Sequence, residues 1–274
     1  MKKVCVITGA TGAICSEFAK EMSKNGYAVA LLDTNEDAAQ AVADEICAYG
    51  GLAKAYHTDV LDKESIVSVH KKVLAELGKC TVLINGVGGN NAYATTAREY
   101  FEYGDEKRND IFTFFDLDKS GFDFVFDLNV KGVLLATQIF ALDMIGEKGC
   151  SIINISSVNA CIPNTKTPAY SSAKAAVSNF TQWLAVHFAK EDIRVNAIAP
   201  GFFSTAQNKD VLWNADGTPT ERTEKIIAAT PMGRLGEPSE LLGALKFLVD
   251  PVAASFVTGT VISVDGGFSA YSGV

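Results

Sequence analysis

A chain of 274 residues, 48% of them hydrophobic, is long enough to bury a sizeable core and fits one large domain. Its net charge of −8, without any run of basic residues, argues against binding to nucleic acid or to an anionic membrane. Because no signal-peptide pattern or bilayer-spanning apolar stretch stands out, and the six cysteines are scattered without metal-ligand spacing, we expect a cytoplasmic protein with reduced thiols and no zinc site.

The first regular pattern is a short apolar strand, Val4–Thr8, followed by a glycine-rich turn over Gly9–Cys15 and a helical pattern up to Asn25. Glycines let the backbone turn tightly, and the N–H groups at the start of a helix can bind a pyrophosphate. We therefore expect this turn to form the phosphate cradle of a dinucleotide site.

The second strand, at 27–32, ends at Asp33. An acid at this position can accept hydrogen bonds from the ribose diol of an adenosine and would repel a 2′-phosphate. No Arg or Lys follows at Thr34 or Asn35 to attract such a phosphate. The pattern favours NAD over NADP, with a solvated acid or a helix cap as the alternative reading of Asp33.

Helical and strand patterns continue to alternate after Asp33. A second glycine loop at Asn85–Gly89 would let the backbone approach a ligand closely. The insert at 90–119 is irregular and rich in aromatic residues, and loops of this length are usually functional or mobile. The regular elements expected here are a helix at 35–49, a strand at 52–57, a helix at 62–77 capped by Asp62, and a strand at 81–84.

Three aspartates, Asp116, Asp118 and Asp127, partly match a calcium-binding loop. The last ligand position holds Asp rather than Glu, and no partner motif accompanies the loop, so we expect no metal. A simpler interpretation is that Ser120 caps a helix at 121–145.

Asn129 lies in the middle of this helix, on a face that should be buried. Asparagine is a poor residue for a helix interior, and a buried amide needs hydrogen-bond partners. It could hold a water near an active site, or it could be an ordinary satisfied amide.

The central stretch begins with an apolar strand at 151–155, which would deliver Ser157 to its tip. A helix at 169–189 then carries Tyr170 and Lys174, which share one face because they lie four residues apart. A nearby ammonium group would lower the pKa of the tyrosine and make it a proton donor and acceptor near neutral pH. The Ser157 hydroxyl could hold a substrate oxygen. Taken alone, a Tyr and a Lys four apart also occur by chance.

The last third of the chain contains Pro200–Gly201 after a strand and a segment with little regular pattern at 202–230, which we interpret as a substrate lid. Strands alternate with helices throughout, without a linker or repeat. We therefore expect a single α/β domain over 1–274, with a doubly wound parallel sheet of about seven strands and helices on both faces. The remaining expected elements are a strand at 193–198, a helix at 237–249 and a strand at 260–264.

Taken together, these motifs resemble the short-chain dehydrogenase/reductase family over nearly the whole chain. The residues that carry the resemblance are Thr8-Gly9-x-x-Gly12, Asp59-Val60, Asn85-Gly86, Asn129, Ser157, Tyr170-x-x-x-Lys174, Arg194-Val195-Asn196, Pro200-Gly201 with Thr205, and Asp265-Gly266-Gly267.

The resemblance implies a Rossmann-type fold and NAD(P)-dependent chemistry on a CH–OH group. Tyr170 would be the general acid in reduction and the base in oxidation. Lys174 would hold the nicotinamide ribose and lower the pKa of Tyr170. Ser157 would polarise the carbonyl, and Asn129 would hold a proton-relay water.

It also implies where the dinucleotide would lie. The family usually has glycines at the positions of Ala13 and Cys15, and this departure bears on cofactor affinity rather than on the fold. The expected cofactor-binding residues are Gly9, Thr11, Gly12, Ile14, Asp33, Asp59, Val60, Asn85, Gly86, Tyr170, Lys174, Pro200, Gly201, Phe203 and Thr205.

A finer resemblance is to a bacterial subgroup that acts on sugar acids, the D-mannonate oxidoreductases or fructuronate reductases. It rests on Cys15, the long insert, the run Asn154–Ala160 and the tail from Asp265. Gluconate 5-dehydrogenases and other sugar or polyol dehydrogenases are alternatives, and a non-catalytic dinucleotide-binding module is a remote one.

A sugar-acid site should contain a cation and several amides or hydroxyls. Lys166, just before the catalytic helix, could meet the substrate carboxylate, and Asn90, Asn159 and Gln207 lie on neighbouring loops. Arg98 is another candidate cation or a simply solvated one. The family resemblance further implies a homotetramer, assembled through the helices at 121–145 and 169–189 and the last strand.

Overall fold

Within residues 3–205 and 208–273, which the computed structural model describes, seven parallel strands form one sheet in the order β3-β2-β1-β4-β5-β6-β7. Because every pairing is parallel, the carboxyl ends of all the strands meet at one edge of the sheet, where α/β proteins bind ligands. The predicted fold class is confirmed. The strands are β1 (Val4–Thr8), β2 (Ala28–Asp33), β3 (Leu52–His57), β4 (Cys80–Asn85), β5 (Cys150–Ile155), β6 (Ile193–Pro200) and β7 (Val261–Val264).

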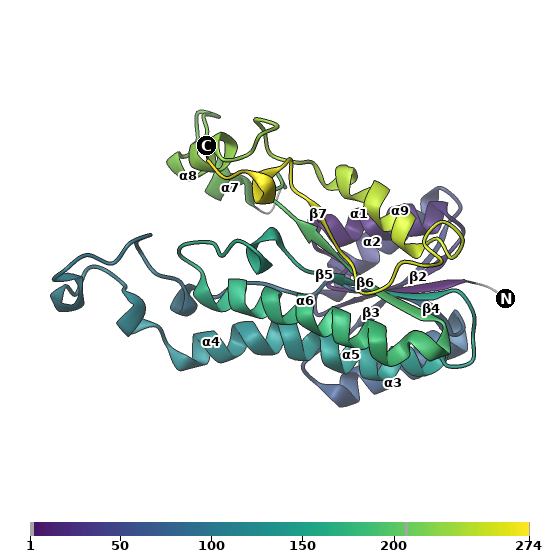
Figure 1. Cartoon of the computed structure of the whole chain (residues 1–274). Coiled ribbons are helices and arrows are strands. Elements are labelled where there is room, and N and C mark those ends of the chain that lie inside the picture. Colours follow the sequence, from purple (N-terminus) through teal and green to yellow (C-terminus); the bar gives the residue numbers. More distant parts are fainter. Residues whose placement is uncertain (1–2, 206–207, 274) are drawn as a thin grey trace.

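Helices cover both faces of the sheet (Figure 1). The central strands are buried from both sides, so they are continuously apolar rather than alternating, and all five residues of β1 are buried. One face carries α1 (Ala13–Lys24), α2 (Glu36–Ala48) and α9 (Leu242–Val249), and the other carries α3 (Lys63–Glu76), α4 (Lys119–Phe126), α5 (Gly132–Phe140) and α6 (Pro168–Phe188).

The helix predicted at 121–145 is a longer composite. A π-helical segment, Asp127–Lys131, joins α4 to α5, and a 3-10 turn, Ala141–Met144, ends the run. The prediction that Ser120 caps this helix is wrong. Asp118 is the cap, and its carboxylate accepts the Ser120 N–H at 2.7 Å.

The run Lys119–Met144 also corrects the expectation that no stretch could span a bilayer. By length and composition it is apolar enough to cross a membrane, since its most apolar 18-residue stretch has a mean hydropathy of 1.4. Half of that stretch is buried inside the fold. It packs against α3, α6 and β4, and this packing accounts for the apolar residues on its buried side.

The insert at 90–119 extends beyond the carboxyl edge of the sheet and carries three short 3-10 turns (Figure 1). It is tied to the loop before α6, because the Thr96 N–H donates to the carbonyl of Lys166 at 2.9 Å. The aspartates that partly matched a calcium loop have local roles here. Asp116 accepts the Thr113 N–H at 2.8 Å, and Asp118 caps α4.

The lid at 202–230 is more regular than expected. It contains a single helical turn, α7 (Lys209–Leu212), and a two-turn helix, α8 (Glu221–Ala228), which Thr220 caps. Gln207, one of the expected substrate residues, lies outside the described residues.

Candidate active site

The fold brings the four expected catalytic residues together at the carboxyl edge of the sheet. Tyr170 and Lys174 share a face of α6, with the Lys174 ammonium 5.7 Å from the centroid of the Tyr170 ring. Ser157 follows β5 and hydrogen-bonds to Tyr170. Asn129 reaches the same place from the π-helical segment, since a Cβ built on Gly88 would lie 2.6 Å from its Oδ1 and 2.9 Å from the Lys174 Nζ.

Lys174 is almost completely buried, with 3% of its surface exposed. Its Nζ donates to the Ile155 carbonyl, at the tip of β5, at 2.8 Å. Burial disfavours the charged amine and lowers the pKa of Lys174 to about 8. The lysine is therefore still mainly protonated at neutral pH, in a fixed position beside the tyrosine.

The pKa of Tyr170 does not follow the expectation. Burial raises it, and the hydrogen bond with the Ser157 hydroxyl opposes that rise. The ammonium of Lys174 lies over the ring and is bound to Ile155, so it does not contact the phenol oxygen directly. In this geometry Tyr170 is a protonated phenol, ready to act as an acid.

Asn129 is completely buried and its amide is engaged by the protein. Its Nδ2 donates to the carbonyls of Gly89 and Val125, both at 2.8 Å, and its Oδ1 accepts the Gly89 N–H at 3.3 Å. Both amide hydrogens are thus committed to backbone carbonyls. Asn129 fastens the second glycine loop to the π-helical segment, and π-helical turns often mark functional sites.

The phosphate turn has the features that a dinucleotide requires. Gly9 has a φ of +65°, and a Cβ there would lie 3.0 Å from the Val87 backbone, so the two glycine loops are closely packed. Gly12 is the N-cap of α1 and offers no side-chain acceptor, so the first N–H groups of that helix are available to a phosphate. Ile14 lies in this first turn. These residues fit a bound pyrophosphate.

Asp33 ends β2 beside this turn. Its Oδ2 accepts the Thr11 N–H at 3.1 Å and the Thr11 hydroxyl at 2.9 Å, while its Oδ1 accepts the Asn35 N–H at 3.0 Å. Asp33 makes no ion pair with any residue that the structure describes. A fixed carboxylate at the strand tip fits the ribose diol expected there.

Asp59 and Val60, two expected cofactor-binding residues after β3, make contacts within the protein. Asp59 accepts the Leu61 N–H at 2.8 Å, which shapes its own turn. Val60 is buried, and Gly132 on α5 approaches it so closely that a Cβ there would lie 3.0 Å from the valine Cγ2. Val60 therefore has a packing role, whatever it contributes to a cofactor.

The side chain of Asn85 points into the protein rather than toward the loops. Its Nδ2 donates to Thr137 at 3.0 Å and to Asn154 at 2.8 Å, and Asn154 in turn donates to Thr181 at 2.9 Å. This buried chain of polar groups between β4, β5 and two helices was not predicted from the sequence. Contact between Asn85 and a cofactor would have to use its backbone.

The residues at the end of β6 and just after it make contacts with β7 and within the lid. Pro200 pairs with Val264 on β7, and Gly201 is pressed against Asp265, where a Cβ would lie 2.7 Å from the Asp265 Cα. The Thr205 N–H donates to Asn208 at 2.9 Å. The contacts of Pro200 and Gly201 hold the start of the lid against β7, and the bond of Thr205 shapes the lid itself.

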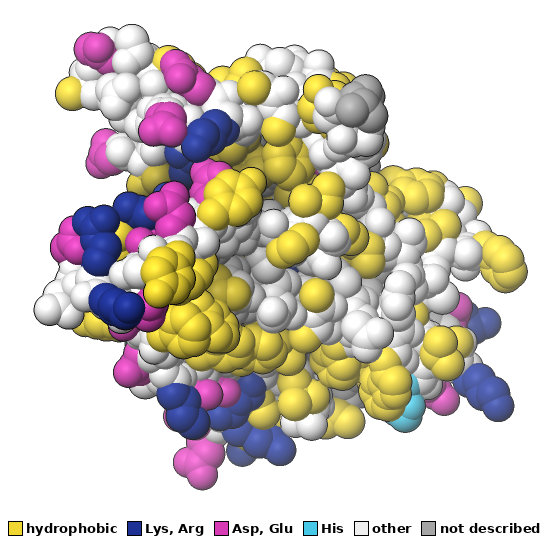
Figure 2. All heavy atoms as spheres, turned by 60° about the vertical axis from the view of Figure 1, so that its left-hand side comes forward, with side chains coloured by type: hydrophobic (Ala, Val, Ile, Leu, Met, Phe, Trp, Pro, Cys, Tyr) yellow, Lys and Arg dark blue, Asp and Glu magenta, His cyan; other side chains and the backbone are white. Residues whose placement is uncertain are grey.

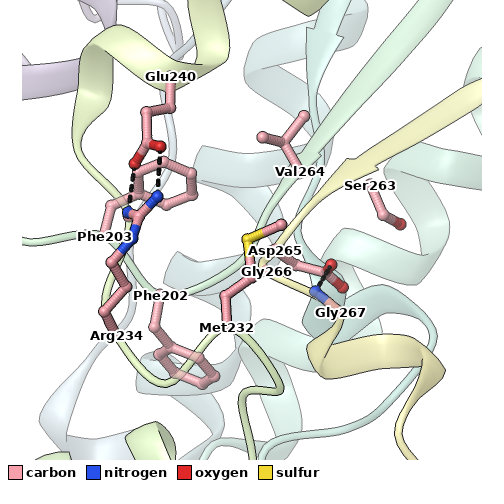
Figure 3. Close-up of a pocket in the computed structure, with 11 residues that line it drawn as sticks. Phe202, Phe203, Met232, Arg234, Glu240, Ser263, Val264, Asp265, Gly266 and Gly267 are labelled. Carbon is pink, nitrogen blue, oxygen red and sulfur yellow. Dashed lines mark hydrogen bonds and ion pairs between the residues drawn. The ribbon is translucent and has the colours of Figure 1, made fainter.

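Phe203 is buried and lines a separate pocket between the lid and the end of β7 (Figure 3). Its ring lies beneath Gly236, where a Cβ would lie 2.6 Å from the ring. The Arg234–Glu240 ion pair stands above it, with contacts of 2.7 Å. None of the four expected catalytic residues lines this pocket, so Phe203 serves packing here rather than the catalytic centre.

The expected substrate residues differ in their exposure and in whether other residues already pair with them. Asn159 is buried two residues after Ser157, whose Oγ accepts its N–H at 3.1 Å. Lys166 is exposed at the junction of the insert and α6. Asn90 donates to Thr95 at 2.8 Å within the insert, and Arg98 is paired with Asp105 and Glu102.

Sequence reasoning missed a contact between the lid and the insert. Lys225 on α8 pairs with Glu99 in the insert at 3.1 Å, across 126 positions of sequence. Figure 2 shows charged side chains of both signs gathered beside a patch of hydrophobic side chains. Neither residue belongs to a motif, so only the folded chain reveals the pair.

Comparison with known proteins shows that the chain is similar to dehydrogenases over nearly its whole length. The model of the short chain dehydrogenase family matches residues 3–215. An uncharacterized oxidoreductase from Haemophilus influenzae is 56% identical over 99% of this chain and 95% of its own length. A 7alpha-hydroxysteroid dehydrogenase from Escherichia coli is 33% identical over 97% and 93%.

A solved structure from Haemophilus influenzae, described as a proposed D-mannonate oxidoreductase with bound NAD, superposes with a TM-score of 0.96. It is 56% identical and the match covers 99% of this chain and 96% of that one.

Proposed function

The chain belongs to the short-chain dehydrogenase/reductase family, and from that membership we propose that it is an NAD-dependent oxidoreductase that interconverts a sugar-acid alcohol and its ketone. D-mannonate and D-fructuronate are the proposed pair. The observation that supports this most directly is that Tyr170 hydrogen-bonds to the Ser157 hydroxyl and has the Lys174 ammonium 5.7 Å from its ring centroid, at the carboxyl edge of the sheet.

The proposed chemistry follows from these contacts. A bound nicotinamide supplies or accepts the hydride. Ser157 donates a hydrogen bond to the carbonyl oxygen of the ketone, and Tyr170 delivers the proton to that oxygen during reduction. In the reverse direction Tyr170 takes the hydroxyl proton. Lys174, held by Ile155, stabilises the negative charge that then develops on the phenol.

NAD is the proposed cofactor. Two observations support it: Asp33 is a fixed carboxylate at the tip of β2, where an acid favours a ribose diol over a 2′-phosphate, and the Haemophilus influenzae structure contains NAD.

The proposal of a sugar-acid substrate rests on the similarity to the Haemophilus influenzae structure and on the polar groups around the site. Lys166 offers an exposed ammonium for the carboxylate, and Asn159 offers an amide beside Ser157. A hydroxylated substrate needs such groups, since each buried hydroxyl must find a hydrogen-bond partner.

We further propose that the protein is a cytoplasmic homotetramer. Exposed apolar side chains on the outer faces of the two long helices support this, including Trp183 and Val186 on α6 and Leu142 and Ile145 at the end of the α5 run. Large apolar side chains left exposed on the surface of a helix are typical of an interface.

The test is an assay that follows reduced nicotinamide by its absorbance, with NAD or NADP against D-mannonate, D-fructuronate, D-gluconate and a 7-hydroxy bile acid. We expect turnover of D-mannonate with NAD and of D-fructuronate with NADH. Tyr170→Phe, which retains the aromatic ring but lacks the hydroxyl, is the matched control and should be inactive. Activity with gluconate alone would overturn D-mannonate and D-fructuronate as the substrate pair, while activity with the bile acid alone, or with none of the four, would overturn the sugar-acid assignment.

A further inference from the structure

Thr11 and Asp33 are joined by two hydrogen bonds across 22 residues of sequence. Both the backbone N–H and the hydroxyl of Thr11 donate to one carboxylate oxygen, Oδ2, at 3.1 and 2.9 Å. The other oxygen, Oδ1, accepts the Asn35 N–H at 3.0 Å. The carboxylate is therefore held from both sides, by the phosphate turn and by the start of α2.

This arrangement restricts the carboxylate to one orientation. A carboxylate has about four acceptor directions, and three of them are used here. Hydrogen bonds to a charged acceptor are the stronger kind, so rotation of Asp33 about its side-chain torsions would sacrifice strong contacts. The negative charge is fixed in position instead of being free to swing into solvent.

We propose that Thr11 is a positioning residue for cofactor selectivity, because it fixes the Asp33 carboxylate against the 2′-position of the adenosine ribose. This inference rests on the proposed function, in which Asp33 selects NAD. A 2′-phosphate can be accommodated only if the acid turns away, and the Thr11 hydroxyl opposes that turn. Selectivity is thus shared between the acid and the phosphate turn.

The experiment compares dissociation constants measured by calorimetry, which need no turnover. ADP-ribose and 2′-phospho-ADP-ribose are titrated into the wild type, Thr11→Val and Thr11→Ser. Valine keeps the shape but removes the hydroxyl donor, and serine keeps the donor. We expect Thr11→Val to reduce the preference for ADP-ribose by roughly fivefold to tenfold, mainly through tighter binding of the phosphorylated ligand. Thr11→Ser should behave as the wild type.

The outcomes separate this inference from the function beneath it. A wild type that binds both ligands equally would show that the NAD preference itself is wrong. A wild type that prefers ADP-ribose together with an unchanged preference in Thr11→Val would overturn the role of Thr11. Equal weakening of both ligands in Thr11→Val would also overturn it, since that is what a purely structural contact in the turn would cause.

If Thr11→Val does not fold, Thr11→Ala provides the same test. It removes the hydroxyl donor and leaves the Asp33 carboxylate, the backbone N–H of residue 11 and the contact with Asn35 in place. We expect the same loss of preference, and an undiminished preference would count against the proposal.

Discussion

The sulfur of Cys15 occupies the space in which a side chain on Gly86 would stand. A Cβ built on Gly86 would lie 2.1 Å from the Cys15 Sγ. Cys15 is on the first turn of α1, and Gly86 is on the loop after β4. Glycine at position 86 therefore lets the loop after β4 pack closely against α1, with the Cys15 sulfur filling the space between them.

This relationship predicts an interaction between the two positions. Gly86→Ala should lower the free energy of unfolding by about 2 kcal/mol, since the added methyl group meets a well-packed sulfur and also the Thr8 carbonyl at 2.8 Å. Cys15→Gly should leave a small cavity and destabilise helix α1. The double variant should lose less stability than the two single variants added together, by about 1 kcal/mol.

Chemical denaturation of the four proteins measures this coupling, and calorimetry with NAD shows whether cofactor affinity follows it. Cys15→Ser, nearly isosteric, is the control for loss of the thiol alone. Strict additivity of the two changes would mean that the sulfur and the loop do not share the space.

The fold could be read from the sequence because its signals are local. Uninterrupted apolar strands, glycine turns and acidic caps such as Asp62 each mark an element boundary without reference to distant residues. Helix α8 was missed because it is only eight residues long and mostly polar, with its apolar residues, Ile226 to Ala228, gathered at one end. The π-helical segment has no compositional signal at all.

The sequence predicted which residues would be at the site, but not the contacts that these residues make with distant parts of the chain. Asn85 was expected to face the cofactor, yet it lies two positions after Leu83, on the strand face that packs against α5, and so meets Thr137. That orientation depends on which face each helix covers. The ion pair of Glu99 with Lys225 depends on how two loops meet, and no local pattern encodes it.

Arg194 illustrates a motif residue whose role is structural. It is 6% exposed, and its guanidinium donates to the carbonyl of Leu248 at 2.6 Å and approaches that of Asp250 at 3.5 Å, at the C-terminal end of α9. Arg194→Met should lower the free energy of unfolding by about 2 kcal/mol, because buried carbonyls lose their donor. Calorimetric melting checks this. Arg222→Met, at an exposed position, should change little, and equal effects of both variants would contradict the capping role.

The buried amine of Lys174 predicts a pH dependence of stability. Its pKa in the folded protein is about 8, against an ordinary value of about 10.4 in the unfolded chain. Between these values the unfolded chain binds more protons, so stability rises with pH through this window. Below about pH 8 the charged amine is buried at full cost, and above about pH 10.4 that cost has gone.

Lys174→Met removes this titration. The variant should be inactive but more stable than the wild type at neutral pH, and its advantage should shrink by about 3 kcal/mol between pH 8 and 10.4. Urea denaturation at several pH values gives the difference, with the exposed Lys190→Met as control. A difference that stays constant with pH would show that burial does not lower the pKa of this amine.

The Glu99–Lys225 pair joins the insert to the lid across the substrate side of the molecule. Lys225 also pairs with Glu221 on its own helix at 3.1 Å, which offers a matched control. All three side chains are at least about one-third exposed, so the pair should add little to global stability. Its effect should instead appear in how well the lid stays closed over a bound substrate.

Glu99→Gln and Lys225→Gln should each raise the KM for the sugar acid about twofold to fivefold with nearly unchanged melting temperatures, and the double variant should be no worse than either. Glu221→Gln, which removes only the contact within the helix, should leave KM as it is. Because exposed charges are screened by salt, the difference between Glu99→Gln and the wild type should fade at high ionic strength. Equal KM values for Glu99→Gln and Glu221→Gln would mean that closure of the lid does not depend on the insert, and that the two segments merely lie beside each other.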